Sequence, residues 1–162
     1  MLIVIDANVL IDYAKTNPGV LALASRYLGQ IYVPREILDE ASADIPQSDC
    51  DRLGLRVVQA TTEQLIEAAS VRSQLSFQDR VCLILARDER WTCLTNDIRL
   101  RRACTELHIP LMWGLEVMID LVRGGWMEKS AAQSVARGIH AINPRHISIA
   151  VLERFQDELD RH

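Results

Sequence analysis

Short apolar runs alternate with segments of helical periodicity over the first two thirds of the chain. The runs are rich in β-branched residues, which is typical of buried strands. We expect strands at residues 2–5, 31–33, 55–60, 91–95 and 109–112. Because the runs are apolar throughout and are separated by helical segments, we expect a mainly parallel sheet covered on both faces.

The segments between the strands place apolar residues at helical spacing. Helices are expected at residues 8–16, 19–29, 34–43, 61–74, 76–90 and 97–107. After these come three more expected helices, at residues 114–125, 127–142 and 144–162. The pattern therefore predicts one α/β domain over residues 1–162 with a three-layer α/β/α architecture, in which an α/β core over 1–112 is followed by a C-terminal helical extension over 113–162.

Composition narrows the function classes. The chain has 162 residues, of which 49% are apolar, so it can bury a substantial core. With 18 Lys+Arg against 22 Asp+Glu, the net charge of −4 argues against a general nucleic-acid coat but not against a nuclease, whose acids gather a metal ion. The cysteines have no metal-ligand spacing, and no segment approaches the roughly 18 apolar residues of a membrane span. We expect a soluble cytoplasmic protein with reduced cysteines and no membrane partner.

Acidic residues occur where the predicted sheet ends. Asp6 follows the first strand and Asp97 follows the fourth. The carboxyl ends of parallel strands meet at one edge, where ligands bind. Glu36 and Glu40 share one face of the helix that begins at this edge, and Asp79 lies near the start of another helix. Several carboxylates at one edge form a ligand set for a hard divalent cation.

Ordinary structural roles explain some of these residues equally well. Asp79 stands three residues after Ser76, which is close to a capping box. Asp97 and Asn8 could each cap a helix. Asp6 differs, because a capping role does not explain an acid at the tip of a strand. An ionised carboxylate buried there is costly unless a positive charge meets it.

The chain resembles the PIN-domain nucleases, including VapC-type toxins, through four segments in order: LIVIDANVL, VPREILDEA, LSFQDRVCLILA and CLTND. The resemblance covers about residues 2–112, and the helical tail is similar to extensions on some PIN-domain proteins. It implies that the catalytic and metal-binding acids are Asp6, Glu40, Asp79 and Asp97. Asn8 and Thr95 would be polar companions of this site. Since Ala41 stands where a larger aliphatic residue is common, Glu36 is the alternative to Glu40.

The resemblance implies a Mg²⁺- or Mn²⁺-dependent ribonuclease that leaves 5′-phosphate and 3′-hydroxyl ends. It also implies a homodimer and a role as the toxin paired with a small protein antitoxin. Arg99 and Arg102 share a helical face just after Asp97 and could hold RNA phosphates, although ordinary ion pairs explain such a face equally well.

Two other interpretations fit parts of this sequence. A haloacid-dehalogenase-like or receiver domain needs further residues that this chain lacks, such as a second aspartate at the position of Asn8 in the former. A non-catalytic PIN-like module that binds RNA or protein is the stronger alternative, but such a module is expected to lose acids and this chain keeps all four. The tail carries an apolar stripe at helical spacing, which could dock on its own domain or on a partner. The stripe consists of Ile149, Leu152, Phe155 and Leu159.

Overall fold

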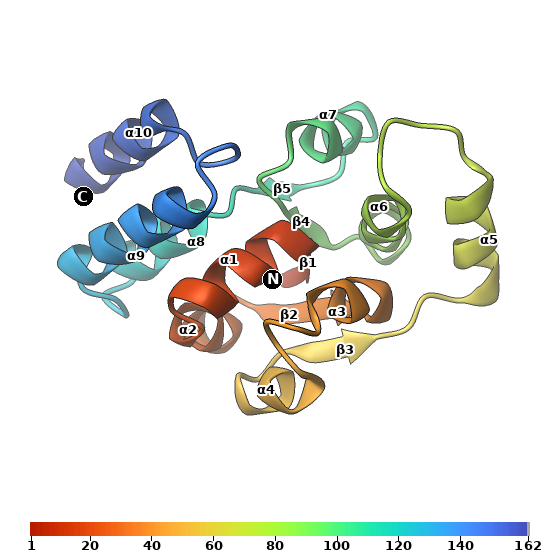
Figure 1. The fold of residues 1–162 in the computed structure, drawn as a ribbon, viewed down its shortest axis with the longest axis horizontal. Coiled ribbons are helices and arrows are strands. Elements are labelled where there is room, and N and C mark those ends of the chain that lie inside the picture. The colour runs from red at the N-terminus through yellow and green to blue at the C-terminus, as the bar shows by residue number, and fades with distance from the viewer. Residues whose placement is uncertain (162) are drawn as a thin grey trace.

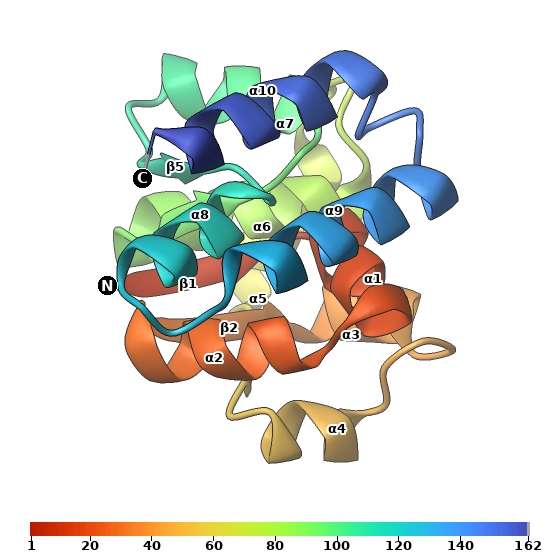
Figure 2. The ribbon, with the colours of Figure 1, turned by 90° about the vertical axis from the view of Figure 1, so that its left-hand side faces the viewer.

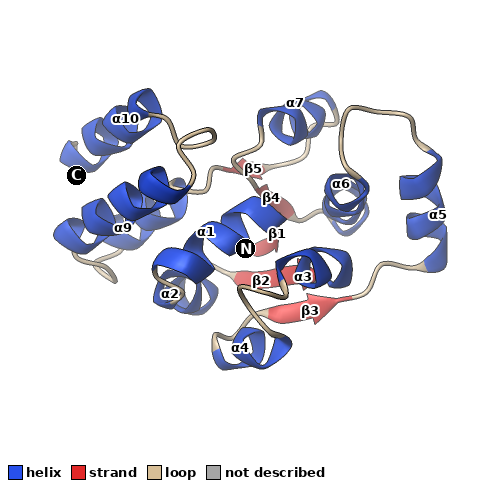
Figure 3. Ribbon diagram, viewed as in Figure 1, coloured by secondary structure: helices blue, strands red, loops and turns tan. Residues whose placement is uncertain are grey.

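The computed structural model describes residues 1–161, which form a central parallel sheet between helical layers (Figures 1 and 3). The strands are β1 (Leu2–Ile5), β2 (Gln30–Pro34), β3 (Arg56–Val58), β4 (Thr92–Leu94) and β5 (Leu111–Met112). Their order is β3-β2-β1-β4-β5, and every neighbouring pair is parallel. The predicted three-layer α/β/α fold with a parallel sheet is therefore confirmed.

Ten helices lie within residues 1–161. They are α1 (Ala7–Thr16), α2 (Gly19–Tyr27), α3 (Arg35–Ala41), α4 (Gln47–Arg52), α5 (Thr62–Ser70), α6 (Phe77–Glu89), α7 (Ile98–Glu106), α8 (Glu116–Arg123), α9 (Lys129–Ile142) and α10 (Ile149–Asp160). In this described part of the chain, no helix is long and apolar enough to cross a membrane.

Helix α5 ends at Ser70 and not at residue 74 as expected, and two further helical features differ from the expectation. Helix α4 was not expected, because it buries only Cys50 and so has no apolar periodicity. Helix α10 begins at Ile149 and not at Pro144, because the Ser148 hydroxyl accepts a hydrogen bond from Val151 N and caps the helix there. Residues 144–148 instead form a loop between α9 and α10.

The side chains of β1 divide the core between the two faces of the sheet. Ile3 and Ile5 belong to the larger hydrophobic cluster, together with residues of α1, α2 and α8. Val4 points the other way and belongs to a cluster with residues of α6 and α7, including Cys82 and Leu100. Because successive residues of a strand face opposite sides, this short apolar strand anchors both helical layers. The cysteines are free and buried, as expected.

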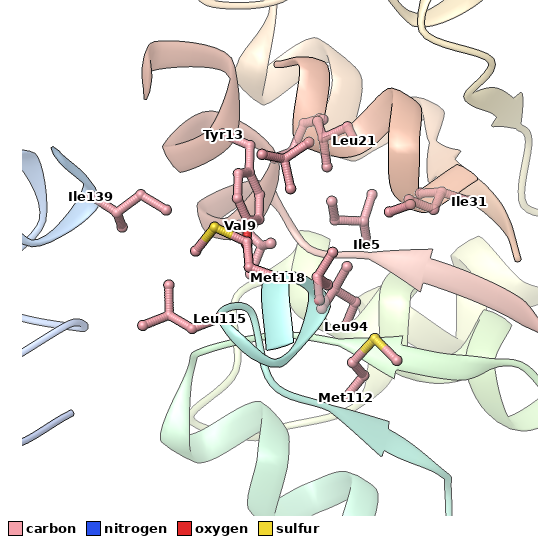
Figure 4. Close-up of a cluster of buried hydrophobic side chains, with 14 of the residues drawn as sticks. Ile5, Val9, Tyr13, Leu21, Ile31, Leu94, Met112, Leu115, Met118 and Ile139 are labelled. Atoms are coloured by element: carbon pink, nitrogen blue, oxygen red, sulfur yellow. The ribbon is translucent and has the colours of Figure 1, made fainter. Parts of the chain in front are cut away.

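The C-terminal helices pack on the larger core (Figure 2). Figure 4 shows Leu115, Met118 and Ile139 in the same buried cluster as Ile5 and Val9, so residues before and after position 112 share one cluster. The organisation of residues 1–162 as a single domain stays a prediction.

The apolar stripe of α10 is mostly used within the domain. Phe155 and Leu159 are fully buried, and Leu152 is partly buried against the same cluster. Only Ile149, which is 63% exposed, faces away. The structure therefore favours docking of the stripe on its own domain.

Gly114 joins the sheet to the extension through a crowded contact. Its backbone N donates to Asn96 Oδ1 at 2.9 Å, and its carbonyl accepts from the Tyr13 hydroxyl at 2.6 Å. A Cβ at this position would lie 2.5 Å from Asn96 Nδ2. Asn96 precedes Asp97 directly, so this contact holds the chain beside the predicted acids.

Gly114→Ala is expected to lower the free energy of unfolding by about 1–3 kcal/mol, because the methyl group must displace the buried Asn96 amide. Gly138→Ala is the control. A Cβ there meets Thr16 Cγ2 at 3.4 Å, and alanine in a helix interior is favoured over glycine by about 1 kcal/mol. Urea denaturation measures both changes. Equal stability of Gly114→Ala and wild type would contradict the prediction.

Candidate functional site

The site lies where the strand order of the sheet changes direction. From β1 the chain proceeds to β2 and β3 on one side, whereas β4 and β5 lie on the other. Crevices at such points are where open parallel sheets bind ligands. The register pairs Ile5 with Leu94, so the next residues, Asp6 and Thr95, lie side by side. Asp6 N donates to the Leu94 carbonyl at 3.1 Å and continues the pairing by one step.

Asp6 is a buried carboxylate, with 1% of its surface exposed. Its Oδ1 accepts from Val9 N at 2.8 Å, and its Oδ2 accepts a short hydrogen bond from the Thr95 hydroxyl. Burial raises the pKa of Asp6 to about 7, opposed by the hydrogen bonds from Thr95 and Val9 and reinforced by the charges of Asp79 and Asp97.

Asp6 is also the N-cap of α1. The expectation that no capping role explains Asp6 was therefore wrong, and so was the alternative that Asn8 caps this helix. The capping geometry was missed because the helix begins directly after the strand, with no intervening loop. Asn8 lies in the first turn of α1, and its side chain has no hydrogen-bond partner within residues 1–161.

Thr95 connects the two strand ends. It is fully buried, donates through Oγ1 to Asp6 and accepts from Asp97 N at 3.0 Å. Asp97 in turn caps α7 by accepting from Leu100 N at 2.8 Å through Oδ1. The capping interpretation of Asp97 is thus correct, and the same residue lies close enough to Asp6 to raise its pKa.

Asp79 interacts electrostatically with both Asp6 and Glu40. It forms a capping box with Ser76, in which Asp79 N donates to Ser76 Oγ at 3.1 Å and Ser76 N donates to Asp79 Oδ2 at 3.2 Å. Its charge helps to raise the pKa of Asp6. The pKa of the exposed Glu40 is also raised, first by partial burial and then by Asp79. The four predicted acids therefore form one coupled group, which we call the acid cluster.

Glu36 differs from Glu40 in the burial and hydrogen bonding of its carboxylate. Its Oε2 is a buried oxygen without a hydrogen-bond partner in the described part of the chain. An orphaned buried oxygen is costly, and a cation or a water molecule would satisfy it. The coupling to Asp79 supports Glu40, whereas the orphaned oxygen keeps Glu36 as its alternative.

The donors of the acid cluster fit a hard cation in type. All are carboxylate oxygens, and the neighbouring Thr95 and Asn8 supply neutral oxygens. Among residues 1–161, no three His, Cys, Asp or Glu side chains converge tightly enough to bind an ion by themselves. Magnesium takes only one or two carboxylates directly and keeps several waters, so a looser group is compatible with it.

The two predicted phosphate-binding arginines are separated. Arg99 lines a pocket of about 350 Å³ with Asp97 and Ile98, and with Arg145 and His146 from the α9–α10 loop. Sequence reasoning missed the last two residues, because nothing in the sequence near this loop points to residues 97–99.

Arg102 lies in a second hollow, away from Asp97. Its Nε approaches Glu106 Oε1 at 3.6 Å, and both side chains are well exposed. The ion-pair interpretation therefore describes Arg102, while Arg99 remains beside the acid cluster.

Asp6→Asn is expected to stabilise the protein in excess chelator. Because folding raises the pKa of Asp6 from 3.8 to about 7, the folded chain favours the protonated carboxyl, and wild-type stability falls as the pH rises through that window. Asparagine can accept from Val9 N and donate to Thr95 Oγ1 without charge. The gain should be greatest above about pH 7, at most about 4 kcal/mol, and vanish near pH 4.

Urea denaturation between about pH 4 and about pH 8 measures this difference. Asp39→Asn, at an exposed position next to Glu40, is the control and should be as stable as wild type. A variant less stable than wild type throughout this range would contradict the role given to burial.

Comparisons with known proteins identify the family of this chain. Among solved structures, the chain is similar to a PilT N-terminus domain protein from the hyperthermophilic archaeon Sulfolobus solfataricus P2. The identity is 12%, the TM-score is 0.57, and the match covers 74% of this chain and 92% of the other. No curated protein matches this chain. A family model described as PIN domain matches residues 2–160. Since this match spans nearly the whole chain, the protein belongs to the PIN-domain family.

Proposed function

We propose that this protein is a ribonuclease that hydrolyses RNA phosphodiester bonds at the acid cluster with the help of Mg²⁺ or Mn²⁺. One observation carries the proposal: a fully buried carboxylate, Asp6, lies at the switch point of the sheet with its pKa raised to about 7. Coupling to Asp79 and Asp97 adds to this shift. Such a costly arrangement is expected where a cation compensates it. Membership of the PIN-domain family supports nuclease activity.

Asp6, Glu40, Asp79 and Asp97 are the residues proposed to hold the cation, directly or through water. The chemistry that the cation supplies when bound is Lewis acidity, which lowers the pKa of a water molecule and offsets charge on the phosphate. Thr95 orients the Asp6 carboxylate through its hydroxyl and fixes Asp97 through the backbone. Such supporting bonds set the direction of ligand oxygens. Asn8 can orient a water molecule or substrate from the first turn of α1.

Asp6→Asn and Glu40→Gln are expected to reduce RNA cleavage by more than about 100-fold, the upper range for groups that only orient a ligand. Asp39→Asn, on the same helix as Glu40, should cut at the wild-type rate. Glu36→Gln tests the alternative: a loss as large as that of Glu40→Gln would assign Glu36 a share of the site. Gel analysis of end-labelled single-stranded RNA measures the rates and should give 5′-phosphate and 3′-hydroxyl ends.

Metal removal is the second arm of this experiment. Cleavage should stop in excess chelator and return with added Mg²⁺ or Mn²⁺. Undiminished cleavage in chelator, or by Asp6→Asn, would refute the mechanism.

A non-catalytic module that binds RNA or protein is the second candidate. The absence of three tightly converging ligands within residues 1–161 favours it. A binding module would retain RNA affinity, show no cleavage with any divalent cation, and keep its activity in Asp6→Asn.

We also propose that this protein is a cytoplasmic homodimer. We propose further that it is the toxin of a toxin–antitoxin pair and binds a small protein inhibitor. Because the α10 stripe is largely buried, support comes from the family resemblance and from two exposed apolar side chains, Ile98 (79% exposed) and Ile149 (63% exposed). An inhibitor that inserts an arginine would complement the charge of the acid cluster.

Light scattering of the purified protein should give twice the monomer mass at micromolar concentration. Ile98→Lys together with Ile149→Lys is expected to shift it toward monomer, because charge is disfavoured in an apolar interface. The untagged protein purified from its own cells should carry the small companion. A lone wild-type monomer without a companion would count against both proposals.

A further inference from the structure

The pocket beside the acid cluster is built from two distant parts of the chain. Asp97, Ile98 and Arg99 come from the start of α7, whereas Arg145 and His146 come from the loop between α9 and α10. We call this the Arg145 pocket; its volume is about 350 Å³. Asp97 belongs to both the pocket and the acid cluster, so whatever enters the pocket lies next to the proposed cleavage site.

The loop that carries Arg145 is held in place by hydrogen bonds and by a buried side chain. Asn143 Nδ2 donates to both carboxylate oxygens of the buried Asp12 on α1, at 3.1 and 3.2 Å. Ile147 is fully buried; its N donates to the Asn143 carbonyl at 3.0 Å, and its carbonyl lies 2.6 Å from His140 Nδ1. A loop held in this way loses little further freedom when a ligand binds.

The two arginine side chains of the pocket, Arg99 and Arg145, are not paired with neighbouring acids in the described chain. Neither Arg99 nor Arg145 forms a salt bridge with a carboxylate in the described chain. The one side-chain hydrogen bond of Arg99 runs from Nη1 to the Gln74 carbonyl at a long 3.4 Å. Arg145 is exposed. Two guanidinium groups without carboxylate partners in a pocket are suited to an anion with several oxygens.

We propose that the Arg145 pocket binds a phosphate of the RNA strand next to the phosphate that is cleaved at the acid cluster. The inference rests on the proposed ribonuclease function and adds residues from the C-terminal extension to it. Arg99 and Arg145 grip the phosphate oxygens, and His146 supplies a further hydrogen bond. Asp97 repels phosphate unless a cation intervenes, so the flanking phosphate lies on the arginine side while the scissile one lies on the cation side.

This arrangement makes Arg145 and His146 substrate-binding residues, with no part in the bond-breaking step. Removing the charge of Arg145 should therefore raise KM and leave kcat nearly unchanged, since the acid cluster is intact. A lost charged hydrogen bond corresponds to about a tenfold effect.

The test compares Arg145→Gln and Arg99→Gln with the control Arg137→Gln, an exposed arginine of α9 outside the pocket. Each pocket variant should raise KM for single-stranded RNA about tenfold and lower the salt dependence of kcat/KM by about one charge. Arg145→Lys should keep the salt dependence while KM rises in part. Arg137→Gln should match wild type, and thermal unfolding checks that all variants fold.

A binding measurement separates the two proposals. In the Asp6→Asn background, fluorescence anisotropy of a labelled RNA with Mg²⁺ should show about tenfold weaker binding once Arg145→Gln is added. If wild type cuts RNA while neither pocket variant changes KM or affinity, the pocket proposal is overturned and the ribonuclease stands. If wild type neither cuts nor binds RNA, both are overturned.

Discussion

The carboxylate of Asp6, buried at the end of β1, is the constraint around which this structure is arranged. Desolvation makes its charge costly, and the two hydrogen bonds from Val9 N and the Thr95 hydroxyl offset that cost only in part. Within residues 1–161, the charged side chains that shift its pKa are Asp79 and Asp97, which are also acids. The charged form of Asp6 is therefore destabilised in the folded protein, and a bound cation would offset this destabilisation. Residues that serve a functional site commonly lower the stability of the folded protein.

Structural and chemical roles coincide in the acid cluster. Asp6 and Asp97 each accept a backbone N–H from the helix that follows them, and Asp79, in the first turn of α6, accepts from the backbone N of the N-cap Ser76, so each carboxylate is held at the start of a helix. Asp97 uses Oδ1 and Asp79 uses Oδ2 for this purpose, and the other oxygen of each has no hydrogen-bond partner within residues 1–161. Capping thus orients these side chains without using their whole capacity to bind. The favourable interaction of a carboxylate with a helix N-terminus contributes to stability at the same time.

Sequence patterns predicted the features that depend on neighbouring residues. The apolar run at residues 2–5 indicated a strand buried on both faces, and the position of Asp6 and Asp97 after their strands indicated a shared edge; both agree with the structure. The capping role of Asp6 was missed because no loop separates β1 from α1. Contacts between distant residues leave no local signal. Asn143 and Asp12 are 131 positions apart, and the place of Arg145 beside Asp97 follows only from how α9 and α10 dock.

The shared core has a consequence for the newly made chain. Ile3 and Ile5 are covered by the same cluster that contains Leu115, Ile139 and Phe155, so an emerging chain that stops at residue 112 covers this face of the sheet only in part, with residues of α1 and α2. All four residues of the acid cluster precede residue 112, whereas the core beside β1 is completed by residues that follow it. A chain translated only to residue 112 therefore carries the whole acid cluster on a sheet whose core is incomplete.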